Sequence, residues 1–194
     1  LKGVSNNAWV GMELDLAGHT VFYDSDEAAF LMARNSWLHN GVIDTQFGAD
    51  ACYQGEAVVF SSPERFNTNS QLTMVSQLRF EGSSHCYHDG TAIAYRIDGR
   101  HDSIGITSTV VRDVTIRWFG YGVRMYADTV LQWGGTREFW INNNTIERLQ
   151  GSGTGCLISA AASDDPQRDT FSINGNVFDG VHYQTNRHEW AGEY

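Results

Sequence analysis

A six-residue pattern of apolar and polar positions recurs six times along the chain and predicts its secondary structure. Each copy starts with Leu, Val or Ile, continues with two turn-forming residues, and ends on a large apolar residue. The copies are the hexads 16–21, 38–43, 75–80, 111–116, 141–146 and 173–178. Their last residues are 22, 37, 36, 30 and 32 positions apart. Such spacing is typical of stacked repeats, in which no single unit buries its apolar face alone.

Each hexad has the period of a β-strand interrupted by a corner. Its fourth and sixth positions share one face and its fifth faces the other way, which is strand alternation. The second and third positions, such as Ala17-Gly18, hold several residues that tolerate a left-handed backbone. We therefore expect strand, corner and strand in each copy. Further apolar segments predict second strands at 57–60, 92–95, 122–125 and 156–158, and third strands at 104–106 and 130–133.

These hexads resemble the coils of the right-handed parallel β-helix superfamily, the pectate-lyase-like fold. Segment 13–21, Glu-Leu-Asp-Leu-Ala-Gly-His-Thr-Val, is similar to opening coils of that superfamily, and segment 141–146, Ile-Asn-Asn-Asn-Thr-Ile, is similar to its central coils. The resemblance spans roughly residues 14–183 and implies an all-β, right-handed parallel β-helix of about six coils. It implies little about function, because this scaffold hosts lyases, hydrolases, phage spikes, adhesins and non-catalytic repeat domains.

Length and charge set the domain organisation and narrow the partners. We expect residues 1–194 to form one β-helix domain. The chain starts at Leu1, close to strand-like sequence, so we expect a fragment of a longer protein. A net charge of −10 argues against nucleic acid as a partner, and no apolar run is long enough to predict membrane insertion. Lys2 is the single lysine against twelve arginines, and Asp outnumbers Glu by 14 to 9. This bias is compatible with an organism or virus of high salt or high genomic GC content, with compositional drift as the favoured alternative.

The sequence predicts no cofactor and no metal site. Cys52, Cys86 and Cys156 lack metal-binding spacing. We expect buried thiols, with a bridge between Cys52 and Cys86 left open. His85 and His88 flank Cys86 in a predicted loop, but their spacing matches no structural zinc motif. A solvated loop is the favoured interpretation, with ligand contact, metal binding or catalysis by these histidines as alternatives.

The residue that follows each hexad is expected to point outward and to stack on its counterpart in the next coil. The resulting row reads Phe22, Asp44, Glu81, Arg117, Glu147 and Asp179. Asp44 and Glu81 would lie one strand spacing apart, about 5 Å, near the carboxylate separation of retaining glycosidases. They are the candidate catalytic pair. The favoured alternative is structural, since alternating charges let an exposed sheet face stack without repulsion.

Two asparagines hold the fourth position of successive hexads. Asn144 and Asn176 are both expected to point into the corner. Stacked side-chain amides can satisfy backbone groups of the corner and one another. We expect a structural asparagine ladder.

Aromatic residues give the strongest indication of binding. Trp118 and Tyr121 lie just beyond Arg117. Aromatic faces pack against sugar rings, and an arginine fork pairs with a uronate or sulfate. Arg117, Trp118 and Tyr121 are therefore the candidate glycan-binding residues, with His85 and His88 at the flank. Packing under loops or against a neighbouring subunit is an equal alternative.

Two classes of function fit these observations. The favoured one is a glycan-recognising or structural module of a virion appendage (a tail spike or capsid turret) or of a cell-surface protein. It would be extracellular or on the virion surface, homo-oligomeric and joined to a larger assembly. The alternative is a secreted polysaccharide lyase or glycosidase. The first is favoured because the chain is expected to be a piece of a larger protein and because the outward row mixes charges. In addition, no Lys-rich or dense Asp cluster resembles those of calcium-dependent pectate lyases. Catalysis is left open.

Overall fold

The computed structural model shows an all-β chain. It describes residues 12–23, 27–32, 35–45, 55–61, 71–82, 90–97, 106–127, 136–147, 154–159, 169–179 and 190–191. These residues form β-strands joined by bends and turns, and none of them is helical.

The strands make two sheets. The larger sheet has ten strands: β1 (Glu13–Asp15), β2 (Thr20–Phe22), β4 (Trp37–Asp44), β6 (Gln71–Glu81), β8 (Ile106–Arg112), β9 (Thr115–Arg117), β11 (Thr136–Asn142), β12 (Thr145–Glu147), β14 (Asp169–Asn174) and β15 (Val177–Asp179). The smaller sheet has six: β3 (Phe30–Met32), β5 (Glu56–Ser61), β7 (Thr91–Ile97), β10 (Tyr121–Ala127), β13 (Thr154–Ser159) and β16 (Trp190–Ala191).

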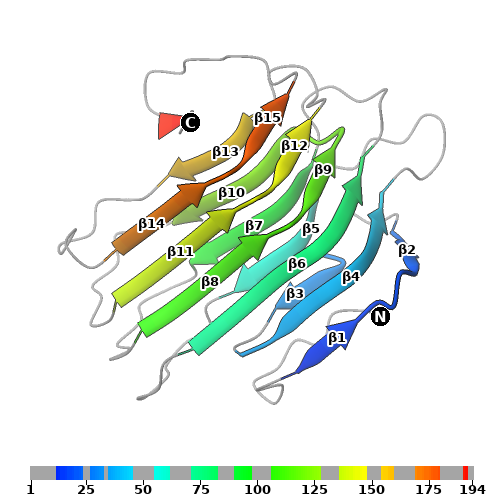
Figure 1. The fold of residues 1–194 in the computed structure, drawn as a ribbon, viewed down its shortest axis with the longest axis horizontal. Helices are drawn as coiled ribbons and strands as arrows, with labels where there is room; N and C mark the ends of the chain where they lie inside the picture. The colour runs from blue at the N-terminus through cyan, green and yellow to red at the C-terminus, as the bar shows by residue number, and fades with distance from the viewer. Residues whose placement is uncertain are drawn as a thin grey trace.

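The chain alternates between these two sheets. β4, β5, β6 and β7 follow one another in sequence but lie in the larger, smaller, larger and smaller sheet. Parallel strands require such crossovers, and every described pairing is parallel except that of β13 with β16. Figure 1 shows the larger sheet in front and the smaller sheet behind it. The predicted all-β, parallel architecture is confirmed.

The predicted second strands are also present. Segments 57–60, 92–95, 122–125 and 156–158 lie in β5, β7, β10 and β13. Of the predicted third strands, only Ile106 falls among the described residues, where it begins β8. The rest of 104–106 and all of 130–133 lie outside them.

The corner is the most regular feature of the repeat. The third hexad position has a left-handed backbone in every copy, with φ values of 76°, 61°, 52°, 55°, 57° and 66° at Gly18, Asn40, Gln77, Asp113, Asn143 and Gly175. Gly, Asn and Asp populate this region more readily than other residues, which explains their recurrence here. The predicted corner is therefore confirmed.

The first corner is longer than the sequence pattern indicates. Leu14 pairs in register with Leu38, and Val21 pairs with Ile43. Val21 follows Leu14 by seven positions, whereas Ile43 follows Leu38 by only five. The extra length is a turn in which Ala17 and Gly18 both have positive φ. Hence Leu14, and not the Leu16 that starts hexad 16–21, is the structural equivalent of the other first positions.

The core lies between the two sheets. Ile43, Phe80, Ile116 and Ile146, all at the sixth hexad position, are 0% exposed. Contacts between the sheets include Tyr95 of β7 against Phe139 of β11, whose ring centroids are 5.0 Å apart in an edge-on arrangement. Four of the six anchors predicted from the hexads thus lie in the interior, and the two end anchors, Val21 and Phe178, are partly buried.

The asparagine ladder is present at the corner. Asn144 is 1% exposed and its amide nitrogen donates to Asn176 Oδ1 at 3.0 Å. The Asn176 amide donates in turn to the backbone oxygen of Ile141 at 2.7 Å. The expected structural role of these two residues is confirmed.

Candidate functional site

A row of apolar side chains crosses the outward face of the larger sheet. Its members immediately precede the first position of a hexad, and successive members are register partners on neighbouring strands: Trp37, Met74, Val110 and Trp140, here called the apolar row. The following residues, such as Leu38 and Val75, are buried in the core. Since side chains alternate along a strand, the row points away from the core. Trp140 is 40% exposed, so the row is accessible.

A row of polar side chains runs beside the apolar row. It lies two positions further along each strand and therefore on the same face. Register pairing joins Asp15, His39, Ser76, Arg112, Asn142 and Asn174 into this polar row. Neighbouring strands are about 4.8 Å apart, so both rows extend across the sheet in parallel. Together they form an elongated strip, apolar along one side and polar along the other.

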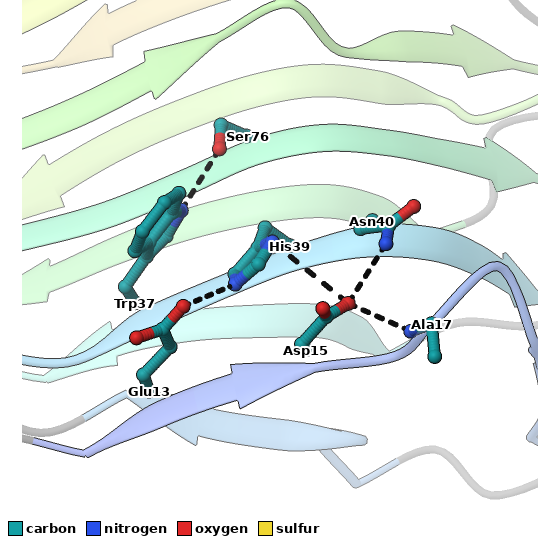
Figure 2. A network of polar contacts seen from close by, with 7 residues as sticks. All are labelled: Glu13, Asp15, Ala17, Trp37, His39, Asn40 and Ser76. Atoms are coloured by element: carbon teal, nitrogen blue, oxygen red, sulfur yellow. Dashed lines mark hydrogen bonds and ion pairs between the residues drawn. The ribbon is translucent and has the colours of Figure 1, made fainter.

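Trp37 is held in one orientation at the N-terminal end of the strip. Its indole Nε1–H donates to Ser76 Oγ at 2.9 Å. Its ring stacks on the imidazole of His39, with centroids 4.0 Å apart and planes inclined by 24°. Figure 2 shows both contacts. The indole is fixed before any ligand arrives.

The carboxylates of β1 hold His39. Its Nε2 lies 2.9 Å from Glu13 Oε1, and its Nδ1 lies 3.9 Å from Asp15 Oδ1 (Figure 2). Asp15 Oδ1 also accepts hydrogen bonds from the backbone N–H of Ala17 at 2.7 Å and from Asn40 Nδ2 at 2.9 Å. The bond from Ala17 is the main reason that the pKa of Asp15 is lowered. Polar groups at this end of the strip therefore bind mainly one another.

The C-terminal end of the polar row is more open. The Arg112 side chain is 50% exposed, and its Nε lies 3.9 Å from Asp113 Oδ2. Asn142 Oδ1 accepts from the backbone N–H of Asn174 at 3.1 Å. The exposed Asn174 donates from Nδ2 to Ser172 Oγ at 2.7 Å. Arg112, Asn142 and Asn174 thus offer polar groups beside Trp140.

The charged row predicted from the residues after each hexad is present. Register pairing joins Asp44, Glu81, Arg117, Glu147 and Asp179 in that order. Phe22, the first residue of the predicted row, pairs with Asp44 and is 65% exposed. The hexad pattern therefore predicted the inter-strand neighbours correctly.

Glu81 differs from the expectation of an exposed outward carboxylate. Its side chain is only 12% exposed, with Arg79 Nε at 2.9 Å and Arg117 Nη1 at 3.8 Å from Oε1. Burial is the main cause that raises the pKa of Glu81, and the nearby Asp44 and Glu147 raise it as well. Together they outweigh Arg79 and Arg117, which lower it. A carboxyl of this kind holds its proton to higher pH than an ordinary glutamate. The catalytic role of Asp44 and Glu81 stays a prediction.

Arg117 is engaged by carboxylates of the protein itself. Its Nε pairs with Glu147 Oε1, and its Nη1 approaches Glu81. Trp118, the next residue, is partly buried with φ of 61°, and the ring of Tyr121 lies 4.9 Å from Arg124 Cζ. Arg117 of β9 thus links β6 and β12 through ion pairs with Glu81 and Glu147. Its glycan-binding role, with Trp118 and Tyr121, stays a prediction.

The remaining sequence candidates lie outside the described residues. These are His85, His88, Cys52 and Cys86. In the described part of the chain, no group of His, Cys, Asp and Glu side chains is arranged to hold a metal ion. Among the residues that the structure describes, there is no helix long and apolar enough to span a membrane.

Sequence reasoning counts Trp37 and Trp140 among six tryptophans that hint at binding, but it does not single them out as site residues. The signal for them is the position just before a hexad, which is apolar in four of the six copies: Trp37, Met74, Val110 and Trp140. Strand alternation predicts that this position points outward, as does the position after the hexad. The aromatic character of the row appears only when the repeats are aligned with one another.

No protein-family model, curated protein or solved structure matches the chain.

Proposed function

We propose that the chain is a right-handed parallel β-helix of about six coils, and that the outward face of its larger sheet recognises a glycan. The alternation of parallel strands between two sheets supports a chain that winds as a helical coil. The right hand is expected because crossovers between parallel strands are overwhelmingly right-handed. The repeated left-handed corner supports a regular coil.

The observation that carries the functional proposal is the pairing of the apolar row with the polar row. Sugar rings present apolar C–H faces and a polar edge of hydroxyl groups. Aromatic rings pack on the former, while amide and guanidinium groups bind the latter. Trp140 with Arg112 and Asn142 supplies this combination on adjacent strands.

The shape of the strip favours an extended oligosaccharide over a small, rounded ligand. The strip crosses β4, β6, β8 and β11 in steps of about 4.8 Å. Trp37 is held by Ser76 and His39, so little side-chain freedom is lost there on binding. An open face of this type is expected to bind a glycan only weakly in a single copy of the domain.

The same proposal places the domain in a homo-oligomeric appendage outside the cell, on a virion or a cell surface. Short repetitive appendages commonly oligomerise to cover exposed edges, and Phe22 and Val177, on strands at opposite ends of the larger sheet, are 65% and 55% exposed. Several weak sites in one oligomer would add through avidity. Neither nucleic acid nor a membrane is proposed as a partner.

A polysaccharide lyase or glycosidase is the second candidate. The observation that favours it is the raised pKa of Glu81 beside the carboxylate of Asp44, because paired carboxyls with different proton affinities act as acid and base in glycoside cleavage. Release of reducing ends or unsaturated uronides by the purified domain would support it. That turnover must disappear in Asp44→Asn or Glu81→Gln while the fold stays intact.

Binding to a glycan array, with an oligomerised form of the domain, tests the recognition proposal. Trp140→Ala is expected to weaken binding about tenfold, as the loss of an aromatic anchor does. Leu31→Ala is the matched control, since Leu31 is 39% exposed but belongs to β3 of the smaller sheet. Absence of binding to any glycan, or equal binding by Trp140→Ala, contradicts the proposal and favours a structural spacer.

A further inference from the structure

Every basic side chain described on the outward face of the larger sheet lies near a carboxylate of the protein. His39 is close to Glu13 and Asp15, Arg79 to Glu81, Arg117 to Glu81 and Glu147, and Arg112 to Asp113. The whole chain has a net charge of −10. This face therefore carries no uncompensated positive charge among its described residues.

Arg112 is the cation that matters for the proposed glycan site. It stands in the polar row between Ser76 and Asn142, one position after the core residue Val111. Its side chain is 50% exposed, so its N–H groups are open to a ligand. A guanidinium in this place would normally attract a carboxylate or sulfate group.

Asp113 counters that attraction. Its carboxylate is 48% exposed and lies 3.9 Å from Arg112 Nε. It occupies the third hexad position, with φ of 55°, where Asn143 and Asn40 stand in other copies of the repeat. Asparagine therefore satisfies the backbone requirement of this position. What Asp113 adds beyond asparagine is a negative charge next to Arg112.

We propose that the face takes an uncharged glycan, and that Asp113 sets this preference by neutralising Arg112. This inference rests on the proposed glycan recognition. Hydroxyl and acetamido oxygens accept hydrogen bonds from Arg112 at no electrostatic cost. The carboxylate of a uronate would approach Asp113 together with Arg112, and repulsion of like charges discriminates between ligands by weakening the wrong one.

The N-terminal end of the polar row also disfavours an anionic glycan. Glu13 and Asp15 have side chains that are 60% and 49% exposed. An anionic chain long enough to reach from Trp140 to Trp37 would meet these carboxylates as well. Even as an imidazolium, His39 would carry one positive charge against two carboxylates, and its side chain is only 10% exposed. Both ends of the strip thus disfavour a polyanion.

The experiment uses pairs of oligosaccharides that share a backbone and differ in charge. The probes are oligogalacturonate, oligoalginate and hyaluronan fragments, each beside its methyl-esterified or carboxyl-reduced counterpart. Binding to the full chain is measured by titration at low and at high salt. The uncharged member of a pair is expected to bind about tenfold more tightly at low salt, with the difference shrinking as salt screens the repulsion.

Asp113→Asn is the decisive variant, since it removes the charge and suits the same left-handed backbone. It is expected to strengthen binding of the charged members severalfold while leaving that of the uncharged members unchanged. Wild type that binds charged members as tightly as uncharged ones overturns the inference, as does an unchanged charged-to-uncharged ratio in Asp113→Asn. If neither member of any pair binds and the glycan array is also blank, the proposed glycan recognition itself fails.

Discussion

The side-chain oxygen of Asn144 accepts a 3.0 Å hydrogen bond from the backbone N–H of Val114, thirty positions earlier in the chain. The amide nitrogen of the same side chain donates to the backbone oxygen of Val111 at 3.1 Å and to Asn176 Oδ1 at 3.0 Å. Asn144 therefore joins three successive copies of the repeat at their corners. Its burial means that water cannot replace these bonds.

Replacing Asn144 should destabilise the fold strongly. Asn144→Leu keeps a similar volume but leaves the Val114 N–H and the Val111 oxygen without this partner. The expected loss in the free energy of unfolding is about 3 kcal/mol, from the cost of buried unsatisfied groups. Urea denaturation measures it. Asn143→Gly is the neighbouring control, because the exposed Asn143 has φ of 57° and glycine accepts that conformation, so its change should stay within about 1 kcal/mol. An equal loss of unfolding free energy in both variants would contradict the stabilising role of the asparagine ladder.

Gly82 is required by the close approach of the next repeat. A Cβ added at this position would collide with the backbone carbonyl of Trp118, and Gly82 N–H also donates to the Arg117 oxygen at 2.9 Å. Backbone cannot move aside as a flexible side chain can. Gly82→Ala should therefore cost about 3 kcal/mol or more.

Gly18→Ala provides the comparison for Gly82→Ala. Nothing lies within 4 Å of a Cβ added at Gly18, whose φ is +76°. Only backbone strain of about 1–2 kcal/mol is expected there. Thermal or urea unfolding of the two variants checks the difference. A Gly82→Ala variant as stable as Gly18→Ala would contradict the close contact between β6 and the segment after β9.

Glu81 should give the stability a specific dependence on pH. Its pKa is raised in the folded state, so the folded protein binds this proton more tightly than the unfolded chain. Its contribution to stability is then fully present below the unfolded-state pKa and is lost as pH rises through the folded-state value. Glu81→Gln cannot titrate. Relative to wild type, this variant should gain stability as pH rises from the ordinary glutamate pKa of 4.5.

Asp15 supplies a control of opposite sign. Its pKa is lowered in the folded state, chiefly by the hydrogen bond from Ala17. Its contribution is present above the unfolded-state pKa and is lost as pH falls through the folded-state value. The stability deficit of Asp15→Asn should therefore shrink as pH falls. Urea titrations at a series of pH values compare both variants, and slopes of the same sign would refute the assignments.

Sequence alone predicts the corners and the stacking of the charged row, because both depend on a period that repeats within each copy. It misses the extra length of the first corner, since Leu16 is apolar and imitates the true first position, Leu14. The burial of Glu81 could not be predicted either, because it depends on how neighbouring strands surround the carboxyl. The apolar row could be recognised only from the register between strands, which places Trp140 beside Val110.

The central claim is that the outward face of the larger sheet binds a glycan through Trp140 and Trp37. The most direct measurement is a nuclear magnetic resonance titration that follows the indole N–H signals of the six tryptophans. The added ligand is the uncharged oligosaccharide that binds most tightly among the probes above, and Trp→Phe variants assign the signals. The account predicts that the Trp140 and Trp37 signals move with ligand concentration. Movement of the Trp118 signal with Trp140 and Trp37 unchanged would contradict it.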